Sequence, residues 1–365
     1  MQRYFVTGYW RNNLGDDLFL QILCDRYPHF KFYTLMDKEY INEFSKISNL
    51  VIIKSNIFLR SINKFFKILN ILPIQILLLP IFFKRYIEIG GSIFIQGKDW
   101  KFRLRQRQFL AKNIREYYIV GSNFGPYRLD AFINGYQNLF NRISGTVFRD
   151  KYSHNLFKID QVSVAPDVIF NLSRGQKSET KKKQITISVI DVYKKAKGNR
   201  LKELQKQYEK KIRSISIYYA SKGYSVVLMS FCDYEGDDNV ITRICLDIPI
   251  KLKKFIRPYS HKNLSVSLNI VKESDKIIAS RFHASILAFL FGIPVLPIAY
   301  SKKTEDVIND IFGEKKWQSI NELIKIPLHN IDDYFVMVKE KSLNDLINES
   351  KNQFQFIDRY VRKNK

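Results

Sequence analysis

The chain has 365 residues, of which 45% are hydrophobic, and 60 Lys and Arg against 35 Asp and Glu give a net charge of +25. This length exceeds what one hydrophobic core usually serves, so we expect two domains. The charge favours phosphorylated ligands and anionic lipid head groups as partners. Because the basic residues are scattered and no zinc-finger or RNA-binding motif is present, nucleic acid is not expected as a partner.

The cysteines and the start of the chain indicate the cellular compartment. Cys24, Cys232 and Cys245 are widely spaced and form no C-x-x-C pair. This favours reduced thiols in a cytoplasmic protein and argues against a disulfide framework or a zinc site. The N-terminus continues directly into the strand-like sequence YFVTGYW, so no signal peptide is expected.

The first half of the chain alternates apolar strands with helical segments. Strands are predicted at residues 4–9, 29–35, 50–55, 86–89 and 117–121, and shorter ones follow at 147–148 and from 162. This rhythm is typical of a doubly wound parallel sheet.

One segment of this half, residues 68–83, is almost wholly apolar. It is short for a membrane-spanning helix, and Pro73 and Pro80 interrupt it. Basic residues flank it, namely Lys64, Lys67, Lys84 and Arg85. The segment is therefore either a core helix of the first domain or an interfacial helix that docks on an anionic bilayer.

Polar residues follow the strands of this half at their carboxyl ends, where ligands bind in open parallel sheets. They are Asp16, Asp17, Gly91, Ser92, Asn123, Arg149 and Asp167. Paired glycines at 90–91 allow a ligand to approach the backbone closely. The two aspartates lie at a helix start, where they either cap the helix or orient a substrate hydroxyl.

In the second half, residues 173–184 are polar and basic and predict an interdomain linker. A second sheet begins at 185, and its most informative part is the stretch 276–303. A strand at 277–279, a buried helix at 284–291 and a strand at 295–300 form a βα unit. Arg281 and His283 come at the end of the first strand. A fixed cation and an imidazole beside a helix N-terminus suit an anionic substrate that gains or loses a proton, although they could be an ordinary surface pair.

These segments predict an α/β protein with a GT-B-like fold, in which two doubly wound parallel-sheet domains face a central cleft. The expected domains are residues 1–172 and 185–325, joined by the linker 173–184. Residues 326–365 are expected to form a helical tail that packs on either domain.

Seven motifs, in order, resemble those of the polysaccharide pyruvyl transferase family, which modifies bacterial capsular, exopolysaccharide and cell-wall glycans. They are GYWRNNLGDDLFL, IGGSIFIQG, VGSNFGPY, VFRDKYSHNLF, APDVIF, MSFCDYEGD and SRFHASILAFLFGIPVLPIAYSKK, and they cover roughly residues 4–310. The family often has a third glycine where this chain has Ser92.

The resemblance implies transfer of a pyruvyl group from phosphoenolpyruvate to two hydroxyls of one sugar, which gives a cyclic ketal and phosphate. Arginine forks suit the carboxylate and phosphate of the donor, and the enol carbon needs a proton, for which His283 is the candidate acid or base. The expected donor-binding residues are Arg149, Arg281, Phe282, Gly91 and Ser92. The expected acceptor-binding residues are Asp16, Asp17, Asn123 and Asp167.

No metal is expected, and no cofactor besides phosphoenolpyruvate as co-substrate. The expected acceptor is a lipid-linked oligosaccharide, with peripheral contact to the inner face of the bacterial membrane. The alternatives are a GT-B glycosyltransferase that uses a nucleotide sugar and a non-catalytic basic protein that binds glycans or membranes.

Overall fold

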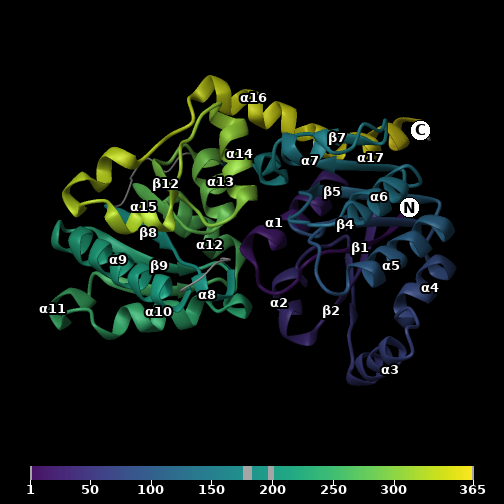
Figure 1. Cartoon of the computed structure of the whole chain (residues 1–365), viewed down its shortest axis with the longest axis horizontal. Helices are drawn as coiled ribbons and strands as arrows, with labels where there is room; N and C mark the ends of the chain where they lie inside the picture. The colour runs from purple at the N-terminus through teal and green to yellow at the C-terminus, as the bar shows by residue number, and fades with distance from the viewer. Residues whose placement is uncertain (1, 176–182, 196–200, 364–365) are drawn as a thin grey trace. The chain divides into compact units, whose positions relative to one another are not determined.

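The computed structural model describes residues 2–175, 183–195 and 201–363 (Figure 1). The chain forms two compact units. The first consists of residues 1–10, 18–171 and 349–365, and the second of residues 11–17 and 172–348. The prediction of two parallel-sheet α/β domains is confirmed.

The first unit is built on a parallel sheet of seven strands in the order β3-β2-β1-β4-β5-β6-β7. Its strands are β1 (Arg3–Thr7), β2 (Lys31–Met36), β3 (Leu50–Lys54), β4 (Arg85–Ile89), β5 (Glu116–Ser122), β6 (Gly145–Phe148) and β7 (Val162–Val164). Its helices are α1 (Leu14–Arg26), α2 (Ile41–Phe44), α3 (Ile57–Ile68), α4 (Ile74–Phe82), α5 (Trp100–Asn113), α6 (Asp130–Phe140), α7 (Lys151–Asn155) and α17 (Gln355–Lys363), with 3-10 turns η1 (Lys38–Tyr40), η2 (Val168–Asn171) and η5 (Lys351–Phe354).

The core of this unit is aromatic. Helices α5 and α6 lie side by side on the sheet (Figure 1), and their apolar residues meet strand residues of β4 to β6. At the centre, rings contact one another in edge-to-face and tilted pairs, a geometry that adds to the gain from apolar burial. These residues are Phe94, Phe124, Phe132, Tyr136, Phe140, Phe148 and Phe157.

The end of the chain is fastened to the first unit. Tyr27 Oη donates to Asp358 Oδ1 at 2.6 Å, and Arg85 donates to Tyr360 Oη at 2.9 Å. The buried Gln353 side chain accepts from the Gly121 N–H at 3.0 Å. Its amide nitrogen donates to the backbone oxygens of Phe148, the last residue of β6, and of Ala165 and Pro166, which follow β7. One amide thus joins backbone groups at the ends of β5, β6 and β7.

The second unit is built on a parallel sheet of six strands in the order β10-β9-β8-β11-β12-β13. Its strands are β8 (Gln184–Ser188), β9 (Ser225–Ser230), β10 (Ile256–Ser260), β11 (Lys276–Ala279), β12 (Val295–Ala299) and β13 (Gln318–Ser319). Its helices are α8 (Val192–Lys195), α9 (Leu201–Ser221), α10 (Asp237–Leu246), α11 (Ile250–Lys253), α12 (Leu264–Lys272), α13 (Phe282–Phe291), α14 (Lys302–Phe312), α15 (Ile320–Lys325) and α16 (Glu340–Ser350), with 3-10 turns η3 (Asp233–Glu235) and η4 (Leu328–Tyr334).

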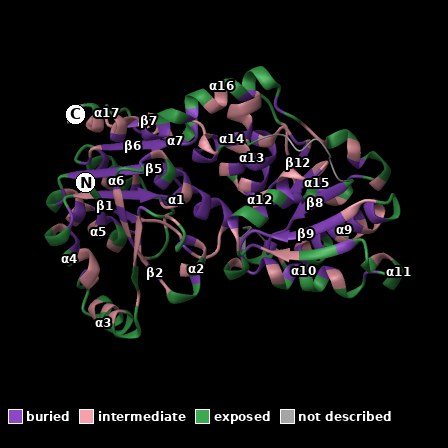
Figure 2. Ribbon diagram, turned by 180° about the vertical axis from the view of Figure 1, so that it is seen from behind, coloured by how far each residue is buried: buried purple, intermediate pink, exposed green. Residues whose placement is uncertain are grey.

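Successive side chains of these strands point to opposite faces of the sheet, because side chains alternate along a β-strand. Ile185 and Ile187 belong to the core under α9, α10 and α15. Thr186, between them, shares a hydrogen bond with Ser274 at the end of α12. The four central strands, β8, β9, β11 and β12, are buried along almost their whole length (Figure 2), as expected for a parallel sheet covered on both faces. The edge strands β10 and β13 are less buried.

The observed units differ from the expected boundaries at two places. Residues 11–17 group with the second unit rather than the first. The expected tail is divided, since 326–348 belong to the second unit and 349–365 to the first. Val336 pairs with Val295 and Ile331 is buried in the second core, which fixes the first part. Most of the predicted linker, residues 176–182, lies outside the described residues.

Residues 68–83 do not form the single helix that their composition suggested. Asn70 has a φ of 55° and ends the first helix, and Pro73 precedes the first residue of α4. Leu72, Leu79 and Phe83 are buried, whereas α3 has no buried residue. Within the described part of the chain, no helix is long and apolar enough to cross a membrane.

We predict that Gln353→Leu destabilises the protein by about 2–4 kcal/mol, because a buried N–H and buried carbonyl oxygens lose their partner. The control is Gln355→Leu, since the amide nitrogen of that neighbour is buried without a hydrogen bond. The measurement is urea unfolding followed by tryptophan fluorescence. Equal stability of the two variants would contradict the role assigned to Gln353.

Candidate functional site

Each sheet contains a point at which the strand order reverses, and ligands of open parallel sheets bind there, outside the carboxyl ends of the strands. In the first unit this point lies between β1 and β4, and residues 90–92 follow β4 directly. In the second unit it lies between β8 and β11, and residues 280–283 follow β11. Two groups of predicted site residues therefore occupy the positions that the fold provides for ligands.

The first group is assembled within the first unit around Arg149. Its guanidinium donates to Asp167 Oδ2 at 2.9 Å and to Asn123 Oδ1 at 3.0 Å. Ser92 Oγ donates to the same amide oxygen at 3.2 Å. A Cβ added to Gly91 would lie 2.5 Å from Arg149 Nη2, so any larger residue there would force the guanidinium to shift. Five predicted residues thus form one cluster.

The Arg149 and Asp167 side chains are only 1% and 0% exposed. Burial raises the pKa of the Asp167 carboxyl, and Arg149 acts in the opposite direction. The Arg149 guanidinium is therefore engaged by side chains of its own unit. The direct donor contact of Arg149 stays a prediction, and the observed contacts join its own loop after β6 to the loops after β4, β5 and β7.

The second group is assembled around Arg281, at the N-terminus of α13. Its Nε donates to Asp237 Oδ2 at 2.8 Å, and its terminal nitrogens donate to Asp237 and Glu235. Asp237 Oδ2 also accepts from the N–H groups of Phe231 and Cys232. Burial acts to lower the pKa of Arg281, but the two carboxylates outweigh it and raise that pKa well above its usual value. Arg281 is therefore a permanent cation that fixes the loop after β9 to α13.

Residues 11–17 pack on this same loop within the second unit. The Leu14 N–H donates to the Phe231 oxygen at 3.0 Å, and the Arg11 guanidinium lies 4.9 Å from the centre of the Tyr234 ring. The segments 11–17, 231–237 and 280–283, which lie far apart in the sequence, therefore meet in one place.

His283 lies in the first turn of α13 and is half-buried, while Phe282 beside it is buried. The imidazole packs directly against the backbone of Gly15. A Cβ added to Gly15 would lie 1.6 Å from His283 Nδ1 and 2.3 Å from its Cγ. The missing side chain of Gly15 is what leaves room for the candidate catalytic group.

Asp16 and Asp17 are both buried in the first turn of α1. Asp17 Oδ2 lies 3.1 Å from Nε2 of His261, and Nδ1 of that ring lies 2.7 Å from Ser267 Oγ. The sequence reasoning missed His261. The available signal was its position directly after β10, at the same edge of the sheet as the other candidates.

The residues of this site also bear on nucleophilic catalysis by a thiol and on metal binding. Burial raises the pKa of the Cys232 thiol to about 12, so it stays protonated near neutral pH and is a poor nucleophile. Among the residues that the structure describes, no group of three or more His, Cys, Asp or Glu side chains could hold a metal ion. The absence of a metal or cofactor from the reaction stays a prediction.

The sequence comparisons identify relatives of this chain. Residues 13–302 match the family described as polysaccharide pyruvyl transferase. A curated relative, the amylovoran biosynthesis protein AmsJ of Erwinia amylovora, is 25% identical over 248 residues. That match covers 62% of this chain and 59% of the relative, so the chain spans about three fifths of the length of the relative.

The fold is similar to those of several solved structures. They include MnaA of S. aureus with UDP (TM-score 0.59, 11% identity, 99% of this chain and 97% of the other) and HepE of Anabaena with UDP and glucose (0.57, 10%, 100% of both). The sucrose-phosphate synthase of Thermosynechococcus elongatus has a TM-score of 0.54 at 9% identity, with 99% of each chain covered. At these identities the likeness establishes the GT-B-like fold alone.

We predict that Gly15→Ala destabilises the protein by about 1–3 kcal/mol, because the new methyl group overlaps the His283 ring. In a His283→Ala background the same substitution should cost much less, since the overlapping ring is absent. The measurement is a double-mutant cycle of the free energy of unfolding. If Gly15→Ala costs the same in both backgrounds, the imidazole does not occupy the space beside Gly15.

Proposed function

We propose that this chain, which belongs to the polysaccharide pyruvyl transferase family, transfers pyruvyl from phosphoenolpyruvate to two hydroxyls of a sugar. The acceptor is a bacterial capsular, exopolysaccharide or cell-wall glycan precursor carried on a lipid. The products are a cyclic pyruvate ketal and phosphate. The family match over residues 13–302 and the relative from amylovoran biosynthesis support this assignment.

The reaction moves two protons, because each of the two hydroxyls loses one, the methylene carbon takes up one and the departing phosphate takes up the other. One sugar hydroxyl adds to the central carbon of the enol, the methylene carbon takes up a proton and becomes a methyl group, and the hydroxyl loses its own proton. The second hydroxyl then attacks the same carbon, loses its proton, and phosphate leaves with the electrons of the broken C–O bond. A group that can both donate and accept a proton near neutral pH suits these steps, and histidine is the side chain that does so.

The observation that carries the proposal is the position of His283. It stands at the point where the strand order of the second sheet reverses, in the first turn of α13, with Gly15 packed beside its ring. The first turn of a helix also presents N–H groups that attract anions, and phosphoenolpyruvate carries a carboxylate and a phosphate. We assign proton transfer to His283 and a positioning role to Arg281.

The remaining role assignments are proposals of the same kind. Asp16 follows Gly15, which packs beside His283, and we assign Asp16 to an acceptor hydroxyl. Asp17 is fully buried and paired with His261, so it would reach an acceptor only if that pair opened. Asn123 and Asp167 are engaged by Arg149, so they would reach an acceptor only if that cluster opened. Because Arg149 and Arg281 belong to different units, their joint grip on one donor stays a prediction.

We predict that His283→Ala lowers the rate of phosphate release from phosphoenolpyruvate in the presence of acceptor by roughly 10² or more, as expected for loss of a general acid or base. The control is His329→Ala, because His329 is an exposed residue of the same unit. Its rate should match the unsubstituted protein. Near-normal turnover by the folded His283 variant would remove this residue from the reaction.

The competing function is a glycosyltransferase with a nucleotide-sugar donor, which is favoured by the similarity of the fold to structures solved with UDP. Thermal shift separates the two functions. We predict that phosphoenolpyruvate raises the melting temperature, by an amount that corresponds to about 2.7 kcal/mol at one hundred times its dissociation constant.

In the same assay UDP and UDP-glucose should leave the melting temperature unchanged. Stabilisation by UDP without any by phosphoenolpyruvate would favour the glycosyltransferase. No stabilisation by any of these compounds would count against both enzymes and favour a non-catalytic binding protein.

A further inference from the structure

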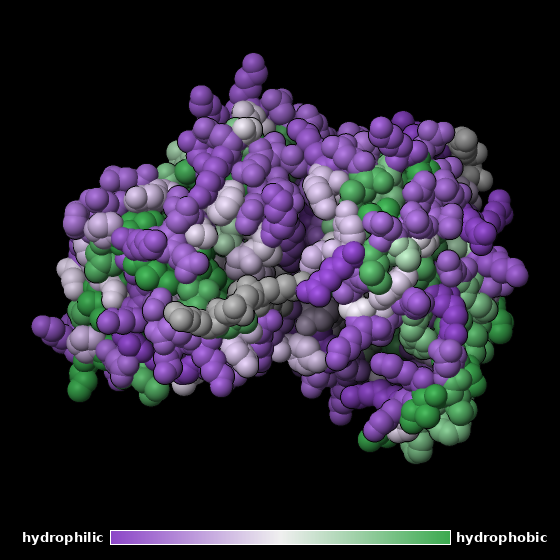
Figure 3. All heavy atoms as spheres, in the orientation of Figure 1, coloured by the Kyte–Doolittle hydropathy of each residue, from purple (hydrophilic) through white to green (hydrophobic). Residues whose placement is uncertain are grey.

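Helices α3 and α4 form a hairpin, residues 56–83, that exposes large apolar side chains. Figure 3 shows hydrophobic surface gathered over the positions of α3 and α4 in Figure 1. Six of these side chains are each at least 58% exposed, namely Ile57, Phe58, Phe65, Ile68, Ile81 and Phe82. Isolated exposed apolar residues are ordinary in soluble proteins, but a contiguous patch of this kind marks an interaction surface.

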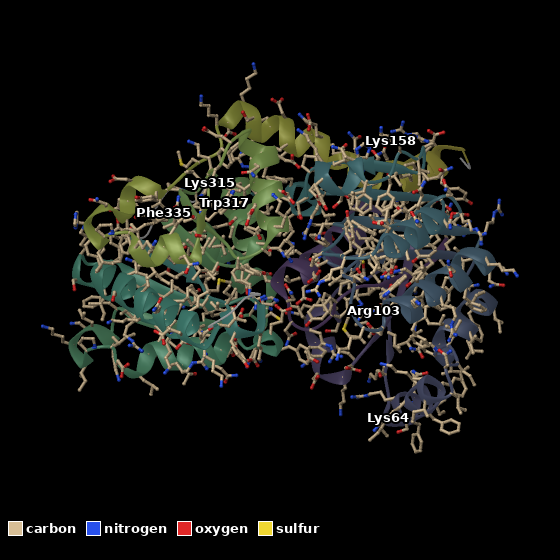
Figure 4. The ribbon with its side chains drawn as sticks, viewed as in Figure 1. Lys64, Arg103, Lys158, Lys315, Trp317 and Phe335 are labelled. Carbon is tan, nitrogen blue, oxygen red and sulfur yellow. The ribbon has the colours of Figure 1, made fainter. Side chains whose placement is uncertain are left out.

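Seen down its axis, α3 has three separate faces. Phe58, Phe65 and Ile68 lie on the exposed apolar face. Arg60, Lys64 and Lys67 lie along one edge of that face, and Figure 4 marks Lys64 on this helix. The inner face is turned toward α4 and carries Asn63. A helix that packs on a core directs its apolar face inward, whereas here that face points to solvent beside a row of cations.

All charged residues of the hairpin are basic. No Asp or Glu occurs between Glu43 and Glu88. Arg60 is 3.9 Å from Asp37, which neutralises it in part. Lys64, Lys67 and Lys84 are all exposed. The apolar patch is thus framed by positive charge, as in helices that lie in the interface of an anionic bilayer.

The hairpin is held in this arrangement by polar contacts at its turn. Asn63 donates to Gln75 Oε1 at 2.6 Å, and its own oxygen accepts from the Ile74 N–H at 3.0 Å. Leu79 and Phe83 anchor α4 in the core of the first unit. The apolar face of α3 is therefore displayed by a fixed element.

We propose that this hairpin docks the protein on an anionic phospholipid bilayer, with the apolar face of α3 and the exposed side of α4 inserted at the level of the head groups. Lys64, Lys67 and Lys84 contact the phosphates around the inserted rings. The helices have 12 and 9 residues, so the hairpin lies in the interface and does not span the bilayer.

A second copy of the chain fits this surface less well. Pairing the hairpin with itself would bring its lysines against the same lysines, and no acidic residue of the segment could neutralise them. An anionic bilayer supplies both the apolar phase and the opposite charge.

The inference deepens the proposed function, because an enzyme on this surface meets an acceptor that is carried on a lipid. The docking itself does not depend on the chemistry of transfer. Vesicle binding and transfer to a water-soluble acceptor can therefore be measured separately.

The test is flotation of the full chain with vesicles of phosphatidylcholine containing one third phosphatidylglycerol, against vesicles of phosphatidylcholine alone. Phe58→Ser/Phe65→Ser removes apolar contact and Lys64→Glu/Lys67→Glu reverses charge, both at exposed positions. The matched controls are Leu129→Ser/Met337→Ser and Lys206→Glu/Lys210→Glu, which change exposed residues outside the hairpin.

We expect the unsubstituted protein to bind the anionic vesicles, more weakly at high salt, and each hairpin variant to bind at least about tenfold more weakly than its control. Equal binding by hairpin and control variants, or no binding by the unsubstituted protein, would overturn the proposal. So would a dimer in gel filtration that Phe58→Ser/Phe65→Ser dissociates.

Transfer to a water-soluble acceptor should be unaffected in the hairpin variants, and vesicle binding should be unaffected in His283→Ala. If phosphoenolpyruvate proves not to be the donor, the proposed function fails while the vesicle result stands. If binding is not localised to the hairpin, the docking proposal fails while the enzymatic assignment stands.

Discussion

The second unit depends on the buried ion pair of Arg281 with Asp237. It joins the residue that precedes α13 to the residue that begins α10, and the acid also holds the backbone N–H groups of residues 231 and 232. Residues 11–17 rest on the loop shaped in this way, and Gly15 in turn borders His283. Removing one partner of such a pair leaves an uncompensated buried charge, so the arrangement is fixed strongly. The position of the candidate catalytic imidazole thus follows from an ion pair that need not touch the substrate.

The first unit uses the same device at the corresponding edge of its sheet. Arg149 joins Asp167 to Asn123, and its guanidinium fills the space that a side chain at position 91 would need. In both units an arginine at a strand end is held by carboxylates of its own unit. These arginines therefore act first on the geometry of the loops, and any contact with a donor is additional. The acidic partners Asp167 and Asp237 are as much part of each site as the cations.

The sequence predicted the fold and the candidate site where hydrophobic periodicity and polar residues at strand ends are present. Apolar runs such as 185–190 predicted the strands, and polar residues after them predicted the edge at which the two clusters lie. It was not informative about partners that only the fold brings together. Nothing in the sequence pairs Arg281 with Asp237, Gly15 with His283, or Asp17 with His261, since each contact depends on strand order. The composition of residues 68–83 hides the turn at Asn70, so the sequence did not predict that the segment is divided there. The division of the tail was not predicted either, because Gln353 binds backbone groups elsewhere in the chain.

We propose that phosphoenolpyruvate binds beside His283, where residues 11–17, 231–237 and 280–283 meet. Hydrogen–deuterium exchange of the full chain, with and without phosphoenolpyruvate, tests it without an acceptor and without any substitution. We expect these three segments to become protected together and UDP not to reproduce the effect. Protection confined to other strand ends, or none at saturating phosphoenolpyruvate, would contradict it.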